Sequence, residues 1–300
     1  MRITEGIIAN RNLADLQRAN SRVADASQQV STGNRILRPS DDPHGTERAL
    51  RLRSDLAATN RYMETAKASI GWAQATDDAL SSVNDVLQSA REVLVQGGND
   101  TLSQRDRNDL ATQIDQLIAQ AKTSGNATYD GEYLFAGQLT DTRPYDPDGG
   151  DAYAGDAGAI VRTIGPGVSV QLNATSGSVL GNGSDGKALQ VLRDIAAHLR
   201  GGTAADANAL RTTDLTAIDA SMAELSTARA EAGAVSNRLT SAANRLLDLK
   251  ASTENVRAGV EYVDMAEAIS RLSHQQTVYQ AALQATGSSL SQPTLMDFLG

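Results

Sequence analysis

Two long stretches of this 300-residue chain repeat small or apolar residues at every seventh position. In the second half the repeat forms one ladder of Ile218, Leu225, Ala232, Leu239, Leu246, Thr253 and Val260, and a second of Val235, Ala242, Leu249, Val256 and Val263. In the first half the corresponding positions are Leu52, Thr59, Ala66, Ala73, Leu80, Leu87 and Leu94, with Leu56, Met63 and Ile70 beside them. A seven-residue repeat is typical of helices that pack along each other. We therefore expect two long helical arms that pair with each other.

Prolines and glycines mark where these arms are interrupted. The six prolines lie at positions 39, 43, 144, 147, 166 and 293, so residues 44–143 and 167–292 are almost free of helix breakers. Gly97 and Gly98 divide the first arm into two helices. Thirteen of the 25 glycines fall between residues 125 and 186, beside short β-branched runs at 159–164 and 168–172. This middle stretch predicts a small β-rich insert.

Each end of the chain carries one further apolar stripe. Near the N-terminus it consists of Ala9, Leu16, Val23, Val30 and Leu37, and near the C-terminus of Ile269, Leu283 and Leu290 with Leu272 and Tyr279 beside them. A single stripe on a short helix has no partner surface of its own, so an isolated terminal helix is expected to fray until another helix covers it.

A short polar segment separates the N-terminal helix from the first long arm. Pro39 is expected to end the first helix, and Pro43 suits the first position of the next helix. Asp42 then stands where a capping carboxylate is favoured, and Asp41 precedes it. We interpret Pro39, Asp41, Asp42 and Pro43 as a hinge and helix cap.

Composition and charge narrow the possible functions. Aromatic residues make up 3% of the chain, which suits Ala- and Leu-rich helical seams better than a large spherical core. A net charge of −9 argues against nucleic acid as a partner. The chain has no cysteine, which excludes thiolate chemistry and Cys-ligated zinc. No apolar run has the length of a signal peptide or a membrane span, so neither membrane insertion nor a cleavable signal is expected.

Three motifs invite a chemical interpretation, and each has a simpler alternative. The segment from Gly181 to Gly186 resembles a nucleotide-binding loop, but Ala188 follows Lys187 where a magnesium-binding hydroxyl is needed. The aspartates at 146, 148, 151 and 156 lack the spacing of a calcium loop. The histidines at 44, 198 and 274 form no metal-binding pair. We therefore expect no enzyme activity, no cofactor and no bound metal.

Four motifs, in the right order along the chain, resemble the flagellin superfamily. They are Ser-Thr-Gly-Asn-Arg-Ile followed by Pro-Ser-Asp-Asp-Pro at residues 31–43, Tyr-Leu-Phe-Ala-Gly at 133–137, Gln-Gln-Thr-Val-Tyr-Gln-Ala-Ala-Leu at 275–283, and Thr-Leu-Met-Asp-Phe-Leu at 294–299. Flagellin itself usually has Ala beside the Asp pair and lacks the Asp-Phe-Leu ending. The prolines at 39 and 43 and this ending are closer to the hook–filament junction members of the superfamily.

The resemblance implies a mainly α fold: an elongated flagellin-like helical rod or coiled-coil bundle, with a small β-rich insert domain at the hairpin end. Residues 1–42 and 262–300 are then terminal helical assembly segments. Residues 43–137 and 187–261 form the helical rod domain, and residues 138–186 form the β-rich outer insert domain.

The implied function is structural: joining the hook-associated layer of the flagellum to the flagellin filament. Assembly is then carried by apolar residues of the terminal helices, namely Ile3, Ile7, Leu16, Val23, Val30, Ile269, Leu272, Tyr279, Leu283, Leu290, Phe298 and Leu299. A segment of the first arm resembles an axial contact of flagellin, through Arg91, Glu92, Val95 and Gln96.

The resemblance also implies partners and a location. The partners are further copies of the chain in a ring-like layer, hook-associated protein 1, flagellin and an export chaperone. The chain is then extracellular, exported through the flagellar type III secretion pathway without a cleavable signal peptide. Two alternatives stay open at this point: a flagellin filament subunit, and a cytoplasmic coiled-coil scaffold or signalling protein.

Overall fold

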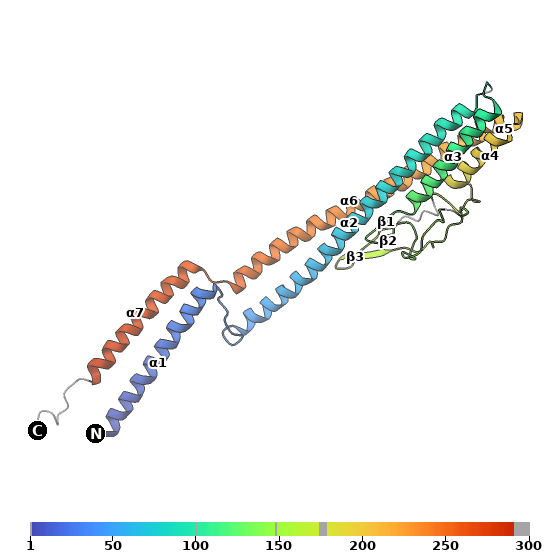
Figure 1. Ribbon diagram of the computed structural model, residues 1–300. Helices are drawn as coiled ribbons and strands as arrows, with labels where there is room; N and C mark the ends of the chain where they lie inside the picture. Colours follow the sequence, from blue (N-terminus) through green and yellow to red (C-terminus); the bar gives the residue numbers. More distant parts are fainter. Residues whose placement is uncertain (1, 100, 148, 174–178, 291–300) are drawn as a thin grey trace, which may run out of the picture. The chain divides into compact units, whose positions relative to one another are not determined.

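The computed structural model describes residues 2–99, 101–147, 149–173 and 179–290 of the chain (Figure 1). Its helices are α1 (Arg2–Thr32), α2 (Pro43–Gly97), α3 (Gln104–Gly125), α4 (Ala188–Gly201), α5 (Ala204–Arg211), α6 (Thr213–Glu261) and α7 (Met265–Leu290). Its strands are β1 (Thr128–Tyr129), β2 (Glu132–Tyr133), β3 (Val161–Gly165) and β4 (Val168–Gln171). The fold is mainly α with a small β-containing insert, as the sequence predicts.

The chain forms two compact units. Unit 1 contains residues 1–58 and 249–300, and unit 2 contains residues 59–248. The division therefore falls inside the long helices α2 and α6. The β-containing insert belongs to unit 2 and has no separate unit of its own, because its apolar side chains Tyr145, Ile164 and Val170 are part of the core of that unit.

Unit 2 is built around one apolar core to which five helices, α2 to α6, contribute. The buried ladder positions Leu80, Leu87 and Leu94 of α2 meet Ile218, Leu225 and Leu239 of α6 in this core, together with residues of α3 and α4. Ion pairs from Arg91 to Asp219 (2.7 Å) and from Arg229 to Asp77 (3.1 Å) also join α2 to α6. The predicted pairing of the two arms thus occurs inside a larger helical core, to which α3, α4 and α5 also contribute.

The C-terminal arm contains more helix ends than the proline pattern predicts. Gly202 adopts a left-handed conformation (φ 68°) and ends α4. Thr203 and Asp206 then form a capping box that starts α5. These local signals end α4 and start α5, and α4 itself packs beside α3.

The second ladder of the C-terminal arm is only partly buried. Ala242 lies in the core, but Leu249 and Val256 are 48% and 40% exposed. The prediction that these two residues belong to a buried seam is therefore wrong. In unit 1 only a narrow stripe of α6 is covered, and it follows the first ladder, on which Val260 is buried.

Two short antiparallel hairpins lie in unit 2, one at residues 128–133 before the predicted insert and one at residues 161–171 inside it. β1 and β2 are joined through Asp130 and Gly131, which both have positive φ angles (54° and 85°), as a tight two-residue turn requires. β3 pairs with β4 from Val161 opposite Gln171 to Gly165 opposite Val168. Tyr129 of the first hairpin contacts the buried Trp72 of α2 edge to face, with ring centroids 6.3 Å apart. The hairpins are thus held on the helices of unit 2.

Candidate assembly site

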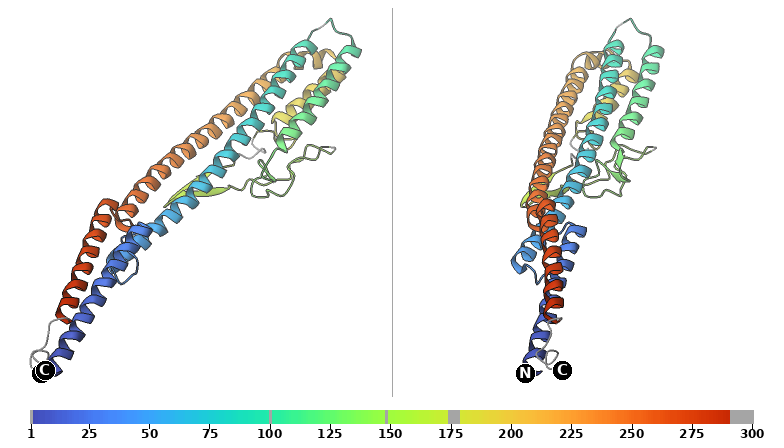
Figure 2. Two further views of the ribbon diagram at one scale, coloured as in Figure 1. Left: turned by 60° about the vertical axis from the view of Figure 1, so that its left-hand side comes forward. Right: turned by 90° about the vertical axis from the view of Figure 1, so that its left-hand side faces the viewer.

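In unit 1, α1 and α7 pack along each other in opposite directions (Figure 2). On α1 the covered positions follow a four-three spacing through Leu16, Ala19, Val23, Ala26 and Val30. On α7 the matching positions are Ala268, Leu272, Gln275, Tyr279 and Ala282. This spacing keeps one narrow stripe of each helix facing the other. The small residues at 19, 26, 268 and 282 allow the two backbones to approach closely.

Large apolar side chains on both flanks of this seam are not covered. Ile269 and Leu283, 51% and 45% exposed, are fourteen residues apart and so lie on the same side of α7. Val278 is nine residues from Ile269, about half a turn around the helix, and is also exposed. On α1, Ile7 and Leu13 are exposed. Unit 1 thus offers apolar surface on more than one side.

The predicted assembly residues therefore fall into three groups. Five of them take part in the α1–α7 seam and are half-buried: Leu16, Val23, Val30, Leu272 and Tyr279. Three are exposed on the outside of the helices: Ile7, Ile269 and Leu283. The remaining four cannot be placed in a seam or on a flank. The structure does not describe the side chains of Ile3 and Leu290, and Phe298 and Leu299 lie wholly outside the described residues.

The loop between α1 and α2 is organised by its two aspartates. Asp42 immediately precedes α2, which begins at Pro43. Its carboxylate accepts a hydrogen bond from the Gly45 amide in the first turn (2.8 Å). Asp41 accepts hydrogen bonds from the amides of Leu37 and Arg38 (3.2 and 2.8 Å). The Gly45 amide, and after it the Arg35 guanidinium, hold the pKa of Asp42 below its ordinary value. Asp42 thus remains ionised and caps the helix at neutral pH.

Arg35 connects this loop to the end of α6. Its Nη2 donates to Asp42 Oδ2 (3.0 Å) and to the Val260 carbonyl (2.9 Å). Its backbone amide donates to the Glu261 carbonyl (2.7 Å). Arg53 of α2 pairs with the Glu261 carboxylate at 2.7 Å. We call Arg35, Asp42, Arg53, Val260 and Glu261 the clasp. Arg35 was present in the motif at residues 31–36, but its partner lies 225 residues away, so spacing alone could not reveal this contact.

The four residues that resemble an axial contact on α2 do not form one patch. Arg91 pairs with Asp219 of α6 (2.7 Å). Glu92 and Gln96 line a polar groove of about 450 Å³ that also contains Gln113, Gln116 and Gln120 of α3. Val95 is exposed and lines a separate hollow with Leu210 and Leu215. Arg91 therefore joins helices within unit 2, while Glu92, Val95 and Gln96 remain accessible on two surfaces.

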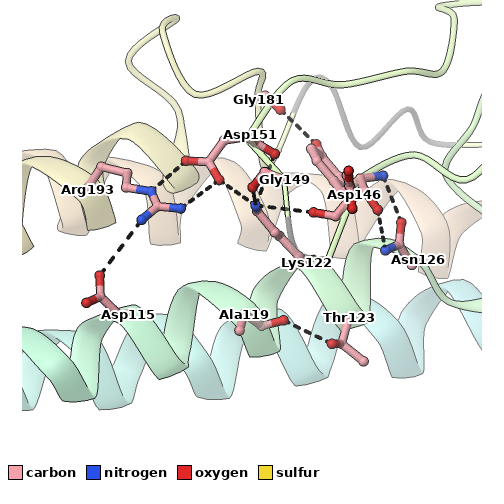
Figure 3. A network of polar contacts seen from close by, with 12 residues as sticks. Asp115, Ala119, Lys122, Thr123, Asn126, Asp146, Gly149, Asp151, Gly181 and Arg193 are labelled. Carbon is pink, nitrogen blue, oxygen red and sulfur yellow. Dashed lines mark hydrogen bonds and ion pairs between the residues drawn. The ribbon is translucent and has the colours of Figure 1, made fainter.

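A buried lysine fixes the insert to the helices of unit 2 (Figure 3). The Lys122 ammonium, on a side chain that is 3% exposed, contacts Asp151 Oδ1 (2.8 Å) and the carbonyls of Gly149 and Gly150 (2.9 and 3.0 Å). Asp151 also pairs with Arg193 of α4 (2.7 Å). The pKa of Asp151 lies below its ordinary value, mainly because Arg193 donates a hydrogen bond to its carboxylate. Burial raises this pKa, and the hydrogen bond from Lys122 lowers it further. Sequence reasoning did not find this network.

The glycine-rich and aspartate-rich motifs have structural roles where the structure describes them. Asp185 accepts hydrogen bonds from the Asn182 and Lys187 amides (2.9 and 3.2 Å). A carboxylate of the loop itself thus binds the amides that would face a phosphate in a nucleotide-binding loop. Asp156 accepts from the amides of Gln138 and Gly158 (2.6 and 3.0 Å). Among the described residues, no group of three or more His, Asp or Glu side chains is arranged to hold a metal ion. Within the same residues, no helix is both long and apolar enough to cross a membrane.

The paired terminal helices, the capped loop and the helical core with its small insert define a class of elongated-helix structural protein. Two family models match the chain: the bacterial flagellin N-terminal helical region over residues 3–140 and the bacterial flagellin C-terminal helical region over residues 215–299. Together they cover well over half of the sequence. The chain belongs to the flagellin family, which makes it part of the bacterial flagellum, an extracellular appendage.

Individual relatives match almost the whole chain. Flagellar hook-associated protein 3 of Escherichia coli (strain K12) is 28% identical over 308 residues, covering 95% of this chain and 96% of the relative. Flagellin of Bacillus subtilis (strain 168) is 28% identical over 309 residues, covering 98% and 97%. A solved structure of a protein assigned to the flagellar hook-associated proteins of Vibrio parahaemolyticus has a TM-score of 0.68 at 24% identity, covering 74% of this chain and 100% of that one. The predicted resemblance and the flagellin-like fold are confirmed.

Proposed function

We propose that this chain is a structural subunit of the hook–filament junction, which joins the hook-associated layer to the flagellin filament and allows the filament to assemble. The observation that carries the proposal is the uncovered apolar surface on both flanks of the α1–α7 pair, through Ile269, Leu283 and Val278. Surface of this kind marks contacts with other proteins. In a family of flagellar subunits, the matching surfaces belong to neighbouring subunits.

The terminal segments, residues 1–42 and 262–300, are the assembly segments in this proposal. Residues 43–137 and 187–261 form the helical body, and residues 138–186 the outer insert. The clasp residues Arg35 and Asp42, with Pro39, Asp41 and Pro43, set the direction in which the chain enters α2. Exposed Val95 and the groove with Glu92 and Gln96 provide axial contacts with the next subunit.

The partners are further copies of the chain in a ring-like layer, hook-associated protein 1 on one side and flagellin on the other. Before assembly, an export chaperone covers the apolar terminal residues, and the chain leaves the cell through the flagellar type III secretion pathway without a cleavable signal peptide. The role is structural and not enzymatic. The acidic net charge of −9 supports protein partners and not nucleic acid.

The junction role is favoured over that of a filament subunit by two sequence features. These are the prolines at 39 and 43 around the Asp pair and the Asp-Phe-Leu ending at 297–299. A filament role has support of its own, because the match to the flagellin of Bacillus subtilis also extends over 98% of this chain. A cytoplasmic scaffold has no such support, and family membership argues against it.

Deletion of the gene tests the proposal. Cells without the protein are expected to build hooks but no filaments, and to release unpolymerised flagellin into the medium because nothing connects the two lattices. Electron microscopy of the cells and immunoblots of the medium measure both effects, with a complemented strain and a flagellin deletion as controls. Bare hooks without released flagellin would instead identify a filament subunit. Intact filaments in the mutant would contradict both flagellar roles.

A further inference from the structure

A pocket of about 210 Å³ lies in unit 1, between the loop after α1 and the first turns of α2. Ile36, Leu37, Pro39 and Leu50 provide most of its apolar lining. Leu50 is 59% exposed, although it lies on a helix with many buried leucines. We call this cavity the loop pocket. It is distinct from the α1–α7 flanks, and no part of the chain that the structure describes fills it.

The charges around the loop pocket favour an acidic group on the occupant. Arg38 and Arg53 are both part of its lining, with Glu261 as the acidic residue. Arg53 already pairs with Glu261. In the described residues, the Arg38 side chain has neither a hydrogen bond nor an ion pair, and the residue is exposed. The loop pocket therefore suits a segment in which apolar side chains surround a single carboxylate.

Residues 291–300, which lie outside the described part of the chain, have this composition. Their sequence is Ser-Gln-Pro-Thr-Leu-Met-Asp-Phe-Leu-Gly. Leu295, Met296, Phe298 and Leu299 surround Asp297, which is the only charged side chain of the segment. We call residues 295–299 the tail motif.

While α7 is helical, the tail motif cannot reach the loop pocket of its own chain. The pocket lies at the end of unit 1 where α7 begins, since Glu261 lines it and α7 starts at Met265. The 26 residues of α7 carry the chain about 37 Å away from that point at 1.5 Å per residue. From Leu290, nine fully extended residues to Leu299 span at most about 32 Å. Even a fully extended return would therefore leave most of the motif short of the pocket.

We propose that the loop pocket binds the tail motif of a second copy of this chain, with Asp297 of one subunit paired to Arg38 of the other. The inference rests on the proposed function in that it names one self-association contact of the junction layer. Such a contact joins two different surfaces, so each subunit offers a pocket to one neighbour and a tail to another. Repetition of a contact of this type gives a closed ring or a helical array.

Disulfide trapping between full-length chains tests the contact, because the natural chain has no cysteine. Purified Leu50→Cys and Met296→Cys chains are mixed and oxidised, and the covalent heterodimer is quantified. The control replaces the pocket variant with Leu247→Cys, which alters a leucine of similar exposure (51%) on α6. We expect at least about tenfold more heterodimer than in the control.

Charge reversal then tests the pairing. Arg38→Glu in the pocket chain should lower the yield at least about threefold, and Asp297→Arg in the tail chain should restore it. A yield equal to the Leu247→Cys control, or one that does not respond to either reversal, would overturn the proposal. Trapping by a cysteine placed in the tail of flagellin, with none by the chain's own tail, would assign the pocket to another subunit and also overturn it. Trapping does not depend on flagella, so its failure alongside normal filament assembly would leave the junction role intact.

Discussion

At the scale of single residues, two adjacent residues of a seam helix can differ strongly in how much of each side chain is exposed. Leu246 belongs to the heptad ladder and is 6% exposed, whereas the next residue, Leu247, is 51% exposed. The sequence predicted this difference because a seven-residue repeat identifies the covered side of a helix. It could not predict that Leu249 is exposed, since the width of the covered stripe depends on how many helices surround α6.

The two leucines provide a matched pair of substitutions. Leu246→Ala is expected to lower the free energy of unfolding by about 2–5 kcal/mol, because it removes buried methyl groups and leaves a cavity. Leu247→Ala is expected to change it by less than about 0.5 kcal/mol. Chemical denaturation of both variants measures the difference. Equal effects would mean that the heptad phase is wrong.

The buried Lys122–Asp151 pair is the second residue-scale feature, and no local pattern predicts it. The two residues are far enough apart in sequence that only the folded insert brings them together. Because neighbouring cations hold the pKa of Asp151 below its ordinary value of 3.8, its contribution to stability is complete above that pH. The contribution is lost as the pH falls below 3.8 and Asp151 takes up a proton in the folded state.

Asp151→Asn should therefore flatten the dependence of stability on pH. Between about pH 5 and pH 2, the natural chain is expected to lose more free energy of unfolding than the variant does. Urea denaturation at several pH values gives the two curves. The exposed Asp130→Asn provides the control, and its curve should follow that of the natural chain. Parallel curves for Asp151→Asn would contradict the assignment.

At the scale of elements, the sequence predicted the long helices, the break at Gly97 and the insert, because heptad repeats, prolines and glycines are local signals. It did not predict that α4 packs beside α3, which depends on their shared core. It also did not predict the division of α4 from α5, which depends on the caps at Gly202 and Thr203. For the terminal helices, the stripe at Leu16, Val23 and Val30 indicated a contact surface. It did not show that α7 is the partner that partly covers it.

The exposed flank of α7 can be altered without disturbing the helix pair. Ile269→Asp should leave thermal unfolding unchanged, because the side chain is already exposed to solvent. It should prevent incorporation into flagella, because a charge replaces the apolar side chain in the proposed contact with the neighbouring subunit. Ser270→Asp adds the same charge at the adjacent exposed position and should assemble normally. Normal swimming of cells with Ile269→Asp would exclude this flank as an assembly surface.

At the scale of the whole molecule, we expect the terminal helices to depend on assembly more than the core does. In the free monomer we expect residues 1–40 and 265–300 to be cut rapidly by protease, while a fragment from about Arg48 to Lys250 survives. The reason is that the α1–α7 seam is narrow and leaves apolar flanks exposed, whereas unit 2 has a continuous core. Mass spectrometry of the fragments over time measures this order. Equal protection of the whole monomer would contradict assembly-coupled stabilisation.

The position of the protein along the flagellum tests the central claim most directly. Leu139 is exposed on the insert, and the natural chain contains no cysteine. In a Leu139→Cys variant, a maleimide dye therefore labels only residue 139 of this protein on intact cells. A junction subunit predicts one short band per flagellum, between hook and filament, in cells that swim normally. Label along the whole filament would identify a filament subunit, and protein found only inside the cells would contradict the flagellar account.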